Sequence, residues 1–447
     1  IGTVPRATAG DLDRALAAAQ TGWRTWRDVD ATTRSRVLAA AGRILEQRSE
    51  ELVRVLTAEQ GKPLAESRNE VGGAIDQFDW FAGEARRIYG RVVPASDPSK
   101  RLTVLREPIG PVAAFTPWNF PALLPARKIA PALAAGCSMI IKPAEEAPGT
   151  ALMIARALQD AGLPDGVLNV VTGDPAAVSA HLLASPIIRK VSLTGSSAVG
   201  RLLIRASAEQ VQDISLELGG HAPVLVFPDI DPTETGTACA RAKFRNAGQV
   251  CIAGTRFYVH DSIVQEFSDA FVRETRALKL GAGTDEATDI GPLSSARRRS
   301  AVEEHVADAL DRGASLLTGG RRPEGFARGY FYEPTVLAEV PAEADIMQIE
   351  PFGPVAPISS FQDFDQVISL ANSTPFGLAG YVFTRDLRTA TLATEGLEVG
   401  MVAVNHFSPS STQIPFGGVK RSGIGAENGS EAIDAYTVVK TVSVSLV

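Results

Sequence analysis

Between residues 111 and 219, short apolar runs alternate with segments of helical character, and this alternation restricts the fold more than any other feature of the chain. Runs that are apolar at every position are typical of strands in a parallel sheet, because helices bury both of its faces. We therefore predict a doubly wound α/β domain, in which ligands bind at the carboxyl ends of the strands. The expected strands are PVAAFT, CSMIIK, GVLNVV, RKVSLT and DISLEL, and the helices between them span about 122–135, 149–161 and 176–183.

The segments that flank this domain predict further units, since 447 residues are too many for one hydrophobic core. Apolar positions at helical spacing indicate one helix near 12–26, a second that runs unbroken from Thr32 to Gly61, and a third over 66–89. Residues 223–400 repeat the pattern of apolar runs and helices, so we expect a second α/β unit there.

Two further segments read as strands outside these units. RLTVLREPIG leads into the first domain, and EAIDAYTVVKTVSVSLV alternates apolar and polar residues up to the terminus. An unpaired apolar strand at a chain end exposes an edge that needs covering. The simplest cover is a second subunit, so we expect a homo-oligomer.

Charge and composition exclude several classes of partner. The formal charge of −7 is spread without a basic block, which disfavours nucleic acid and anionic membranes. Three cysteines form no disulfide framework and suit a reducing compartment, so we expect a cytoplasmic protein. The five histidines show no ligand spacing such as HExxH, and we expect no metal site.

One cysteine, Cys251, lies in the stretch NAGQVCIAG between Gly248 and Gly254. A buried structural cysteine usually has branched apolar neighbours, and here only Val250 and Ile252 provide them. The flanking glycines indicate backbone that approaches something closely or a turn that presents the sulfur. The stretch by itself leaves a structural thiol and a nucleophile equally open.

Polar residues end the first two predicted strands. FTPWNFP places Trp118 and Asn119 after the first strand, where Asn119 forms either an Asx turn or a donor for an oxyanion. IIKPAEE places Lys142 and Glu145 after the second. Lys142 is either the first solvated residue or a ligand of ribose and phosphate oxygens, and Glu145 can accept from ribose hydroxyls.

The fourth and fifth strands also end in informative residues. SLTGSSAVG opens a helix at Gly195, where free backbone N–H groups attract anions, although the motif is neither a P-loop nor GxGxxG. LELGG leaves Glu217 between leucines. Burial of that carboxyl group would favour work as a general base, and a structural ion pair is the alternative.

The order and spacing of these motifs carry more information than any one of them. FTPWNFP, KPAEEAP, LTGSSAVG, LELGG, NAGQVC, EPFGPV and PFGGVKRSG together resemble the aldehyde dehydrogenase superfamily over essentially the whole chain. The resemblance implies that the Cys251 thiolate attacks the aldehyde carbon, with the oxyanion held by the amide of Asn119 and the backbone N–H of Cys251. Hydride passes to a nicotinamide, and Glu217 activates the water that hydrolyses the thioester. Cys137 and Cys239 match no catalytic position.

The same resemblance implies a cofactor site and a division into domains. NAD is expected in preference to NADP, because Glu145 would repel a 2′-phosphate. We expect an aldehyde dehydrogenase-like fold, with an NAD(P)-binding domain (1–90, 108–218 and 401–426), a catalytic domain (219–400) and strands that join subunits into a dimer or tetramer (91–107 and 427–447). The residues implied for the cofactor are Trp118, Lys142, Glu145, Gly195, Ser196, Leu218, Glu350 and Phe352.

Within the superfamily the resemblance is strongest to succinate-semialdehyde dehydrogenases. PARKIAPALAAGC contains Arg127, KFRNAGQVC contains Arg245, and NHFSPSSTQIPFGG contains Ser410 and Ser411. Members that oxidise ω-carboxylated semialdehydes hold the distant carboxylate at these places, and the alternative is that either arginine is solvated or paired. Several such enzymes carry a second cysteine where this chain has Ala253, so no redox-switch disulfide is expected.

Three classes of function remain in view. The first is an NAD-linked hydrolytic semialdehyde dehydrogenase, with a general or aromatic aldehyde dehydrogenase as its variant. The second is a coenzyme A-acylating relative, but the branch known for that activity lacks the glutamate that Glu217 supplies. The third is a catalytically silent protein on the same fold, against which the presence of Cys251, Asn119 and Glu217 argues.

Overall fold

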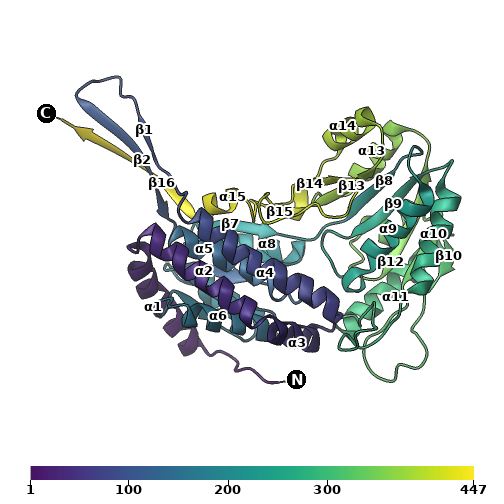
Figure 1. Cartoon of the computed structure of the whole chain (residues 1–447), viewed down its shortest axis with the longest axis horizontal. Helices are drawn as coiled ribbons and strands as arrows, with labels where there is room; N and C mark the ends of the chain where they lie inside the picture. The colour runs from purple at the N-terminus through teal and green to yellow at the C-terminus, as the bar shows by residue number, and fades with distance from the viewer. Residues whose placement is uncertain (1, 447) are drawn as a thin grey trace.

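The computed structural model describes residues 2–446, which form three sheets (Figure 1). The first sheet has six strands in the order β15-β7-β6-β3-β4-β5. Five of these strands are parallel to one another, and each of the five apolar runs predicted to form strands contains one of them. They are β3 (Val112–Phe115), β4 (Met139–Lys142), β5 (Leu168–Val170), β6 (Lys190–Thr194) and β7 (Asp213–Glu217), with the short β15 (Gly423–Ile424) antiparallel to β7.

Helices cover both faces of this sheet, which explains why its strands are apolar at every position. Val112 and Ala114 of β3 face one core, and Ala113 and Phe115 face the other. The first core is shared with α2 (Ala31–Gln47), α3 (Ser49–Gln60), α4 (Leu64–Glu84), α5 (Leu123–Ala135) and α6 (Gly149–Asp160). The second is shared with α1 (Ala9–Arg27), α7 (Pro175–Ala184) and α8 (Ser197–Ala208).

The single helix predicted from Thr32 to Gly61 is two helices, so that prediction is wrong in one detail. At Arg48 the backbone leaves the helical region (φ −101°, ψ 11°) between α2 and α3. The bend lets both helices contact α6, and the Arg48 guanidinium binds Asp160 of that helix at 2.7 Å. The third predicted helix corresponds to α4, which ends at Glu84 and not at the predicted residue 89.

The second sheet has seven strands in the order β10-β11-β12-β9-β8-β13-β14, all parallel except β10. Its strands are β8 (Ala222–Val226), β9 (Gly254–His260), β10 (Ser315–Thr318), β11 (Thr335–Ala338), β12 (Val355–Phe361), β13 (Ala379–Phe383) and β14 (Met401–Val404). The larger helices of this unit are α9 (Pro232–Phe244), α10 (Val264–Ala277), α11 (Ala296–Asp311), α13 (Phe364–Asn372) and α14 (Leu387–Gly396). Because β14 pairs with β13, residues 401–404 belong to this sheet and not to the cofactor-binding domain predicted to contain 401–426.

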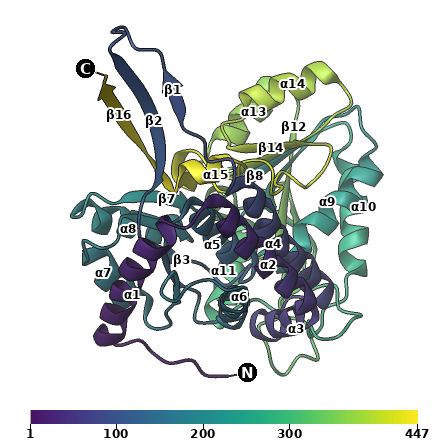
Figure 2. The ribbon, with the colours of Figure 1, turned by 60° about the vertical axis from the view of Figure 1, so that its left-hand side comes forward.

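The third sheet projects from the body as an arm made of β1 (Arg91–Val93), β2 (Lys100–Pro108) and β16 (Thr437–Ser445) (Figures 1 and 2). β16 pairs with β2 along its whole length, so the expectation of an unpaired C-terminal strand is wrong. The outer edge of β16 has no strand beside it within residues 2–446, and Val439 and Val444 are exposed on it. None of the helices in the same range combines the length and apolar character needed to cross a bilayer.

Candidate active site

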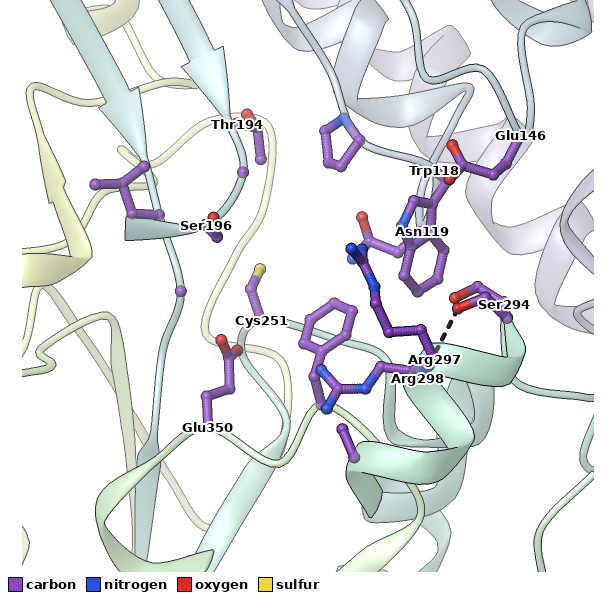
Figure 3. A pocket seen from close by; sticks show the side chains of 17 residues that line it. Trp118, Asn119, Glu146, Thr194, Ser196, Cys251, Ser294, Arg297, Arg298 and Glu350 are labelled. Carbon is purple, nitrogen blue, oxygen red and sulfur yellow. Dashed lines mark hydrogen bonds between the residues drawn. The ribbon is translucent and has the colours of Figure 1, made fainter. Parts of the chain in front are cut away.

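The predicted site residues gather where the carboxyl ends of the six-stranded sheet face the second sheet. β3 lies between β4 and β6, so the loops after β3 and β6 open at the point where the strand order reverses. Trp118 and Asn119 follow β3, and Gly195 and Ser196 follow β6. Together with Cys251 from the opposite sheet they line a cavity of about 460 Å³ (Figure 3).

The loop that carries Cys251 has an unusual backbone. Asn246, Ala247 and Gly248 are three consecutive residues with positive φ (50°, 52° and 72°) in the short 3₁₀ turn η1 (Arg245–Gly248). A Cβ at Gly248 would lie 2.1 Å from the carbonyl oxygen of Gly353, so glycine is required there. The glycine before the cysteine therefore serves a close approach between two loops, as its position in the sequence indicated.

The thiol of Cys251 is partly exposed and lies on the walls of two cavities. One is the 460 Å³ cavity, and the other, of about 210 Å³, lies between Cys251 and the loop 407–410. Burial and the charge of Glu350 raise the pKa of Cys251 and Arg127 lowers it, with a net result of about 12. A thiol with a pKa this high is mostly protonated at pH 7, and the charges on the walls of the two cavities adjust its pKa.

Asn119 is buried and bonded to the cysteine loop. Its side-chain Nδ2 donates to the backbone carbonyl oxygen of Gln249 at 3.1 Å, and the backbone carbonyl oxygen of Asn119 accepts from Asn246 Nδ2 at 3.1 Å. An amide nitrogen has two N–H groups, so one remains for a ligand. Asn119 and Cys251 project into the same cavity (Figure 3), which suits an oxyanion formed at a carbon bonded to the sulfur.

Glu217 ends β7 as expected, but it is buried and lies on the wall of neither cavity. Burial raises the pKa of Glu217 well above its ordinary value, as does Glu427, whereas Lys128 and Arg127 lower it. Lys128 forms a buried ion pair with Glu427. Oε2 of Glu217 has no hydrogen-bond partner among the described residues. The carboxyl group of Glu217 therefore has an oxygen available for a further hydrogen bond, close enough to Cys251 to raise the pKa of the thiol.

Glu350 and Phe352 face the larger cavity from the loop before β12. The backbone N–H of Gly220 donates to Glu350 Oε1 at 3.2 Å, and a Cβ at Gly219 would lie 2.5 Å from Glu350 Oε2. Burial raises the pKa of Glu350 to about 8, opposed by Gly220, Arg298 and Lys243. The ring of Phe352 meets that of Trp118 edge to face, with centroids 5.7 Å apart.

The walls of the larger cavity fit a ligand that carries hydroxyl groups and negative charge. Thr194 Oγ1 is buried without a partner, and Ser196 caps α8, whose first N–H groups favour anions. Arg297 and Arg298 reach in from the first turn of α11 (Figure 3). Leu218 supplies an apolar wall. This donor set, with Glu350 as acceptor, fits a nicotinamide dinucleotide.

Lys142 and Glu145 lie apart from this wall. Lys142 is buried, and its Nζ donates to Glu145 Oε2 at 2.8 Å and to the carbonyl oxygen of Pro143 at 3.1 Å. Glu146 lines the 460 Å³ cavity, whereas Glu145 lines a neighbouring open cavity of about 310 Å³. The consecutive residues Glu145 and Glu146 therefore line two different cavities.

The smaller cavity brings both predicted arginines beside Cys251. Arg127 is buried; its Nη2 donates to Ser410 Oγ at 3.2 Å, and its Nε has no partner. No ion pair within residues 2–446 involves Arg127 or Arg245. Ser411 is exposed and off the wall.

Several wall residues had no signal in the sequence. Phe120, Phe407 and Phe416 give the smaller cavity its aromatic walls, and the Arg127 guanidinium carbon lies 4.4 Å from the Phe416 ring centroid. Isolated phenylalanines are indistinguishable from core residues in a sequence. Arg297 and Arg298 could have been found, because RRR in the first turn after the helix-capping Ser295 is an unusual place for cations.

Comparison with known proteins agrees with this geometry. The model of the aldehyde dehydrogenase family matches residues 1–442. A 4-(hydroxymethyl)benzenesulfonate dehydrogenase of Comamonas testosteroni is 47% identical over 434 residues, which are 97% of this chain and 90% of the relative. The NADP(+) succinate-semialdehyde dehydrogenase of Escherichia coli is 42% identical over 446 residues, 100% of this chain and 92% of the relative.

The solved structures give the same result. The crystal structure of a succinate-semialdehyde dehydrogenase from Burkholderia pseudomallei matches with a TM-score of 0.97 and 44% identity, covering 100% of this chain and 92% of that chain. The predicted fold class is thereby confirmed. The chain belongs to the aldehyde dehydrogenase family, and it is an NAD(P)-dependent aldehyde dehydrogenase.

Proposed function

We propose that Cys251, as thiolate, is the nucleophile in the NAD(P)-dependent oxidation of an aldehyde bearing an anionic group at its far end. The sulfur adds to the carbonyl carbon, and the oxygen becomes an oxyanion held by the free N–H of Asn119 and the backbone N–H of Cys251. When bound, NAD(P) accepts the hydride that leaves this carbon. The product is a thioester on Cys251, and water then cleaves the carbon–sulfur bond to release the acid and restore the thiol.

Glu217 is the proposed base for that water. Burial and Glu427 raise its pKa, which makes its carboxylate a stronger base than that of an exposed glutamate, and Lys128 and Arg127 oppose that rise. Because the carboxyl group lies off both cavities, it must turn toward Cys251 to act. Glu350 is the proposed acceptor for ribose hydroxyls of the cofactor, and Trp118, Leu218 and Phe352 would flank its ring.

One observation carries the substrate proposal: a buried guanidinium that forms no ion pair within residues 2–446 lies on the same cavity wall as the proposed nucleophile. Arg127 has an unpartnered Nε, and Arg245 lines the same cavity without an ion pair among residues 2–446. Buried cations are normally paired, so the partner of Arg127 is expected to be the substrate. We place a carboxylate there, with succinic semialdehyde as the first candidate.

A sulfonated aromatic aldehyde is the second candidate. The walls of the smaller cavity include Phe120, Phe407 and Phe416, which suit a benzene ring, and a benzenesulfonate dehydrogenase is among the relatives. A sulfonate presents the same negative charge to Arg127 as a carboxylate does. The two candidates therefore share one site and differ in what lies between the aldehyde and the anion.

Two matched substrate pairs test the proposal. Succinic semialdehyde against butyraldehyde, and 4-formylbenzenesulfonate against benzaldehyde, each differ mainly by the anion. One charge-assisted contact contributes about 1.5–3 kcal/mol, so kcat/KM should favour the charged member by roughly 10- to 150-fold. The pair with the larger kcat/KM identifies the substrate class. Equal values within both pairs would make this a general or aromatic aldehyde dehydrogenase.

We propose NAD as the preferred cofactor, with NADP also accepted. A ribose near Glu145 would meet a carboxylate that accepts from two hydroxyls and repels a 2′-phosphate. Lys142 pairs with Glu145 and moderates that repulsion, so the preference should be about 1–3 kcal/mol. The ratio of kcat/KM for NAD and NADP measures it, and Glu145→Gln should move the ratio toward NADP.

We also propose that the arm joins subunits. β1, β2 and β16 form a sheet in which no strand lies beside the outer edge of β16 within residues 2–446, and Val439 and Val444 of β16 and Val92 of β1 are exposed. Edges of this kind are usually covered. The units before it are proposed as an NAD(P)-binding domain around the six-stranded sheet and a catalytic domain around the seven-stranded one. Light scattering should give a dimer or tetramer that dissociates when residues 437–447 are deleted.

A further inference from the structure

The first turns of α4 contact the two loops that hold the proposed reacting groups. Glu66 and Glu70 are four residues apart and therefore lie on one face of the helix. Both oxygens of Glu66 accept from the backbone N–H of Asn246, at 3.0 and 2.8 Å. Glu70 Oε1 accepts from the N–H groups of Ala122 and Leu123 at the start of α5, at 2.8 and 3.2 Å.

Glu70 also pairs with a lysine that holds Asn119. Lys62, in the link between α3 and α4, donates from Nζ to Glu70 Oε2 at 2.5 Å and to the carbonyl oxygen of Asn119 at 2.7 Å. Both side chains of the pair are fully buried. A buried pair of this kind is rigid, because removing either partner leaves an uncompensated charge.

The other end of the arrangement is the strained turn before Cys251. Asn246 has a left-handed backbone, which persists only when its surroundings impose it. Its side-chain Oδ1 accepts from Gln60 Nε2 at 2.9 Å, and its backbone N–H is held by Glu66. The segment from Gln60 to Glu70 thus supplies the contacts that fix this turn from outside the seven-stranded sheet.

These contacts link groups that belong to different sheets. Asn119 follows β3 of the six-stranded sheet, and Cys251 precedes β9 of the seven-stranded sheet. Any shift between the two sheets would change the distance from the thiol to the amide, and a misplacement of about 1 Å in such a pair can reduce the rate 100-fold. A single helix that binds both loops removes that freedom.

We propose that Glu66 is a positioning residue that fixes the Cys251 loop against Asn119, with the Lys62–Glu70 pair fixing the Asn119 side. The proposal rests on Cys251 as nucleophile and Asn119 as oxyanion donor. It does not depend on which aldehyde is the substrate.

A matched pair of variants tests it. Glu59 makes the same kind of bond as Glu66, with both oxygens accepting from one N–H, but at Gly149, where α6 begins. Glu59→Ala and Glu66→Ala should lower Tm by similar amounts. Only Glu66→Ala should lower kcat, by about 10- to 100-fold, with KM for NAD within about threefold of wild type. Glu66→Gln keeps an accepting oxygen and should restore kcat to within about fivefold.

Alkylation of Cys251 by iodoacetamide, followed by mass spectrometry, provides a readout without substrate. Cys137 and Cys239 are fully buried, so the reaction reports one thiol. Glu66→Ala should raise the rate constant for alkylation of Cys251 by at least about threefold, because the strained turn relaxes and exposes the sulfur further. Glu59→Ala should leave it unchanged. A Glu66→Ala enzyme that matches Glu59→Ala in kcat and alkylation overturns the proposal.

Failure of the proposed function would look different. If complete alkylation of Cys251 left wild-type oxidation intact, Cys251 would not be the nucleophile, whatever Glu66 does. If Glu66→Ala does not fold, Glu66→Gln and Glu66→Asp carry the comparison. Asp is one methylene too short to reach Asn246 in place, so its kcat should be lower than that of Gln, and the reverse order would also overturn the proposal.

Discussion

The two cavities that meet at Cys251 act on it with opposite charge. The larger one presents Glu350, which raises the pKa of the thiol, and the smaller one presents Arg127, which lowers it. In the larger cavity the protein supplies its own balance, since Arg298 lines the same wall as Glu350 and the charges of Arg298 and the buried Lys243 lower the pKa of Glu350. Glu66 and Glu70 also line the smaller cavity, but Glu70 pairs with Lys62 and Glu66 accepts from the backbone of Asn246. Arg127 and Arg245 have no carboxylate in ion-pair contact within residues 2–446.

This difference indicates that the smaller cavity selects its ligand by charge, whereas the larger cavity binds its ligand without such selection. A cavity wall whose charges balance one another binds ligands by shape, and nicotinamide dinucleotides share one shape. An unbalanced buried cation favours a ligand that brings the missing charge and disfavours one that does not. Selectivity among aldehydes should therefore reside in the smaller cavity, and the thiol should respond to both sides.

The largest effect is expected from Cys251→Ala. Without the sulfur no thioester forms, and kcat should fall by about 10⁴-fold or more. The walls of the larger cavity remain, so NAD should bind within about threefold of its wild-type affinity in a fluorescence titration. If binding and turnover were lost together, the two cavities would not be separable, and the comparison between them would fail.

Glu217→Gln should give the next largest effect. Hydride transfer precedes the step that needs a base, so a burst of NADH close to one equivalent of enzyme should appear in stopped-flow absorbance. Steady turnover should then be about 10²- to 10⁴-fold slower than in wild type. Absence of the burst would show that Glu217 acts earlier, for example by taking the proton from Cys251.

Arginine variants should affect the charged substrate alone. Arg127→Ala should lower kcat/KM for the semialdehyde by about 10- to 150-fold, and Arg245→Ala by less, because Arg127 is the more deeply buried of the two. Butyraldehyde should respond within about threefold to either change. Equal losses for both substrates would make the arginines structural, and selection would have to be sought elsewhere.

The same contrast separates what the sequence could predict from what it could not. Asn119 and Gly195 follow parallel strands and Glu217 ends one, and the carboxyl ends of parallel strands meet at one edge of the sheet wherever the helices lie. Local order in the sequence therefore predicted a common location. The strands themselves were predictable because β3 faces a core on each side.

No local sequence pattern predicted the residues of the smaller cavity in this way. Phe120, Phe407 and Phe416 meet only because loops from different units converge, and each reads as a core residue. Side-chain direction was equally hidden: Glu217 ends its strand as expected but turns away from both cavities, and Lys142 pairs with Glu145 instead of facing the larger one. The break at Arg48 depends on packing against α6, which no local propensity records.

The smallest expected effect is on the alkylation rate of Cys251, and it tests the opposed charges of Glu350 and Arg127. The pKa of Cys251 is raised to about 12, so the thiolate fraction, and with it the alkylation rate, should rise about tenfold per pH unit from 7 to 10 without the plateau of an ordinary cysteine near 8.5. Glu350 contributes only when charged, which is above its own pKa of about 8.

Glu350→Gln removes that charge and should accelerate alkylation about three- to tenfold at pH 9. At pH 6.5 the wild-type carboxyl group is already neutral, so the variant should lie within about twofold of wild type. Glu398→Gln, at an exposed ion pair with Lys420, should change neither rate. An acceleration of the same size at both pH values would mean that the substitution opened the cavity, since a steric effect does not titrate with Glu350.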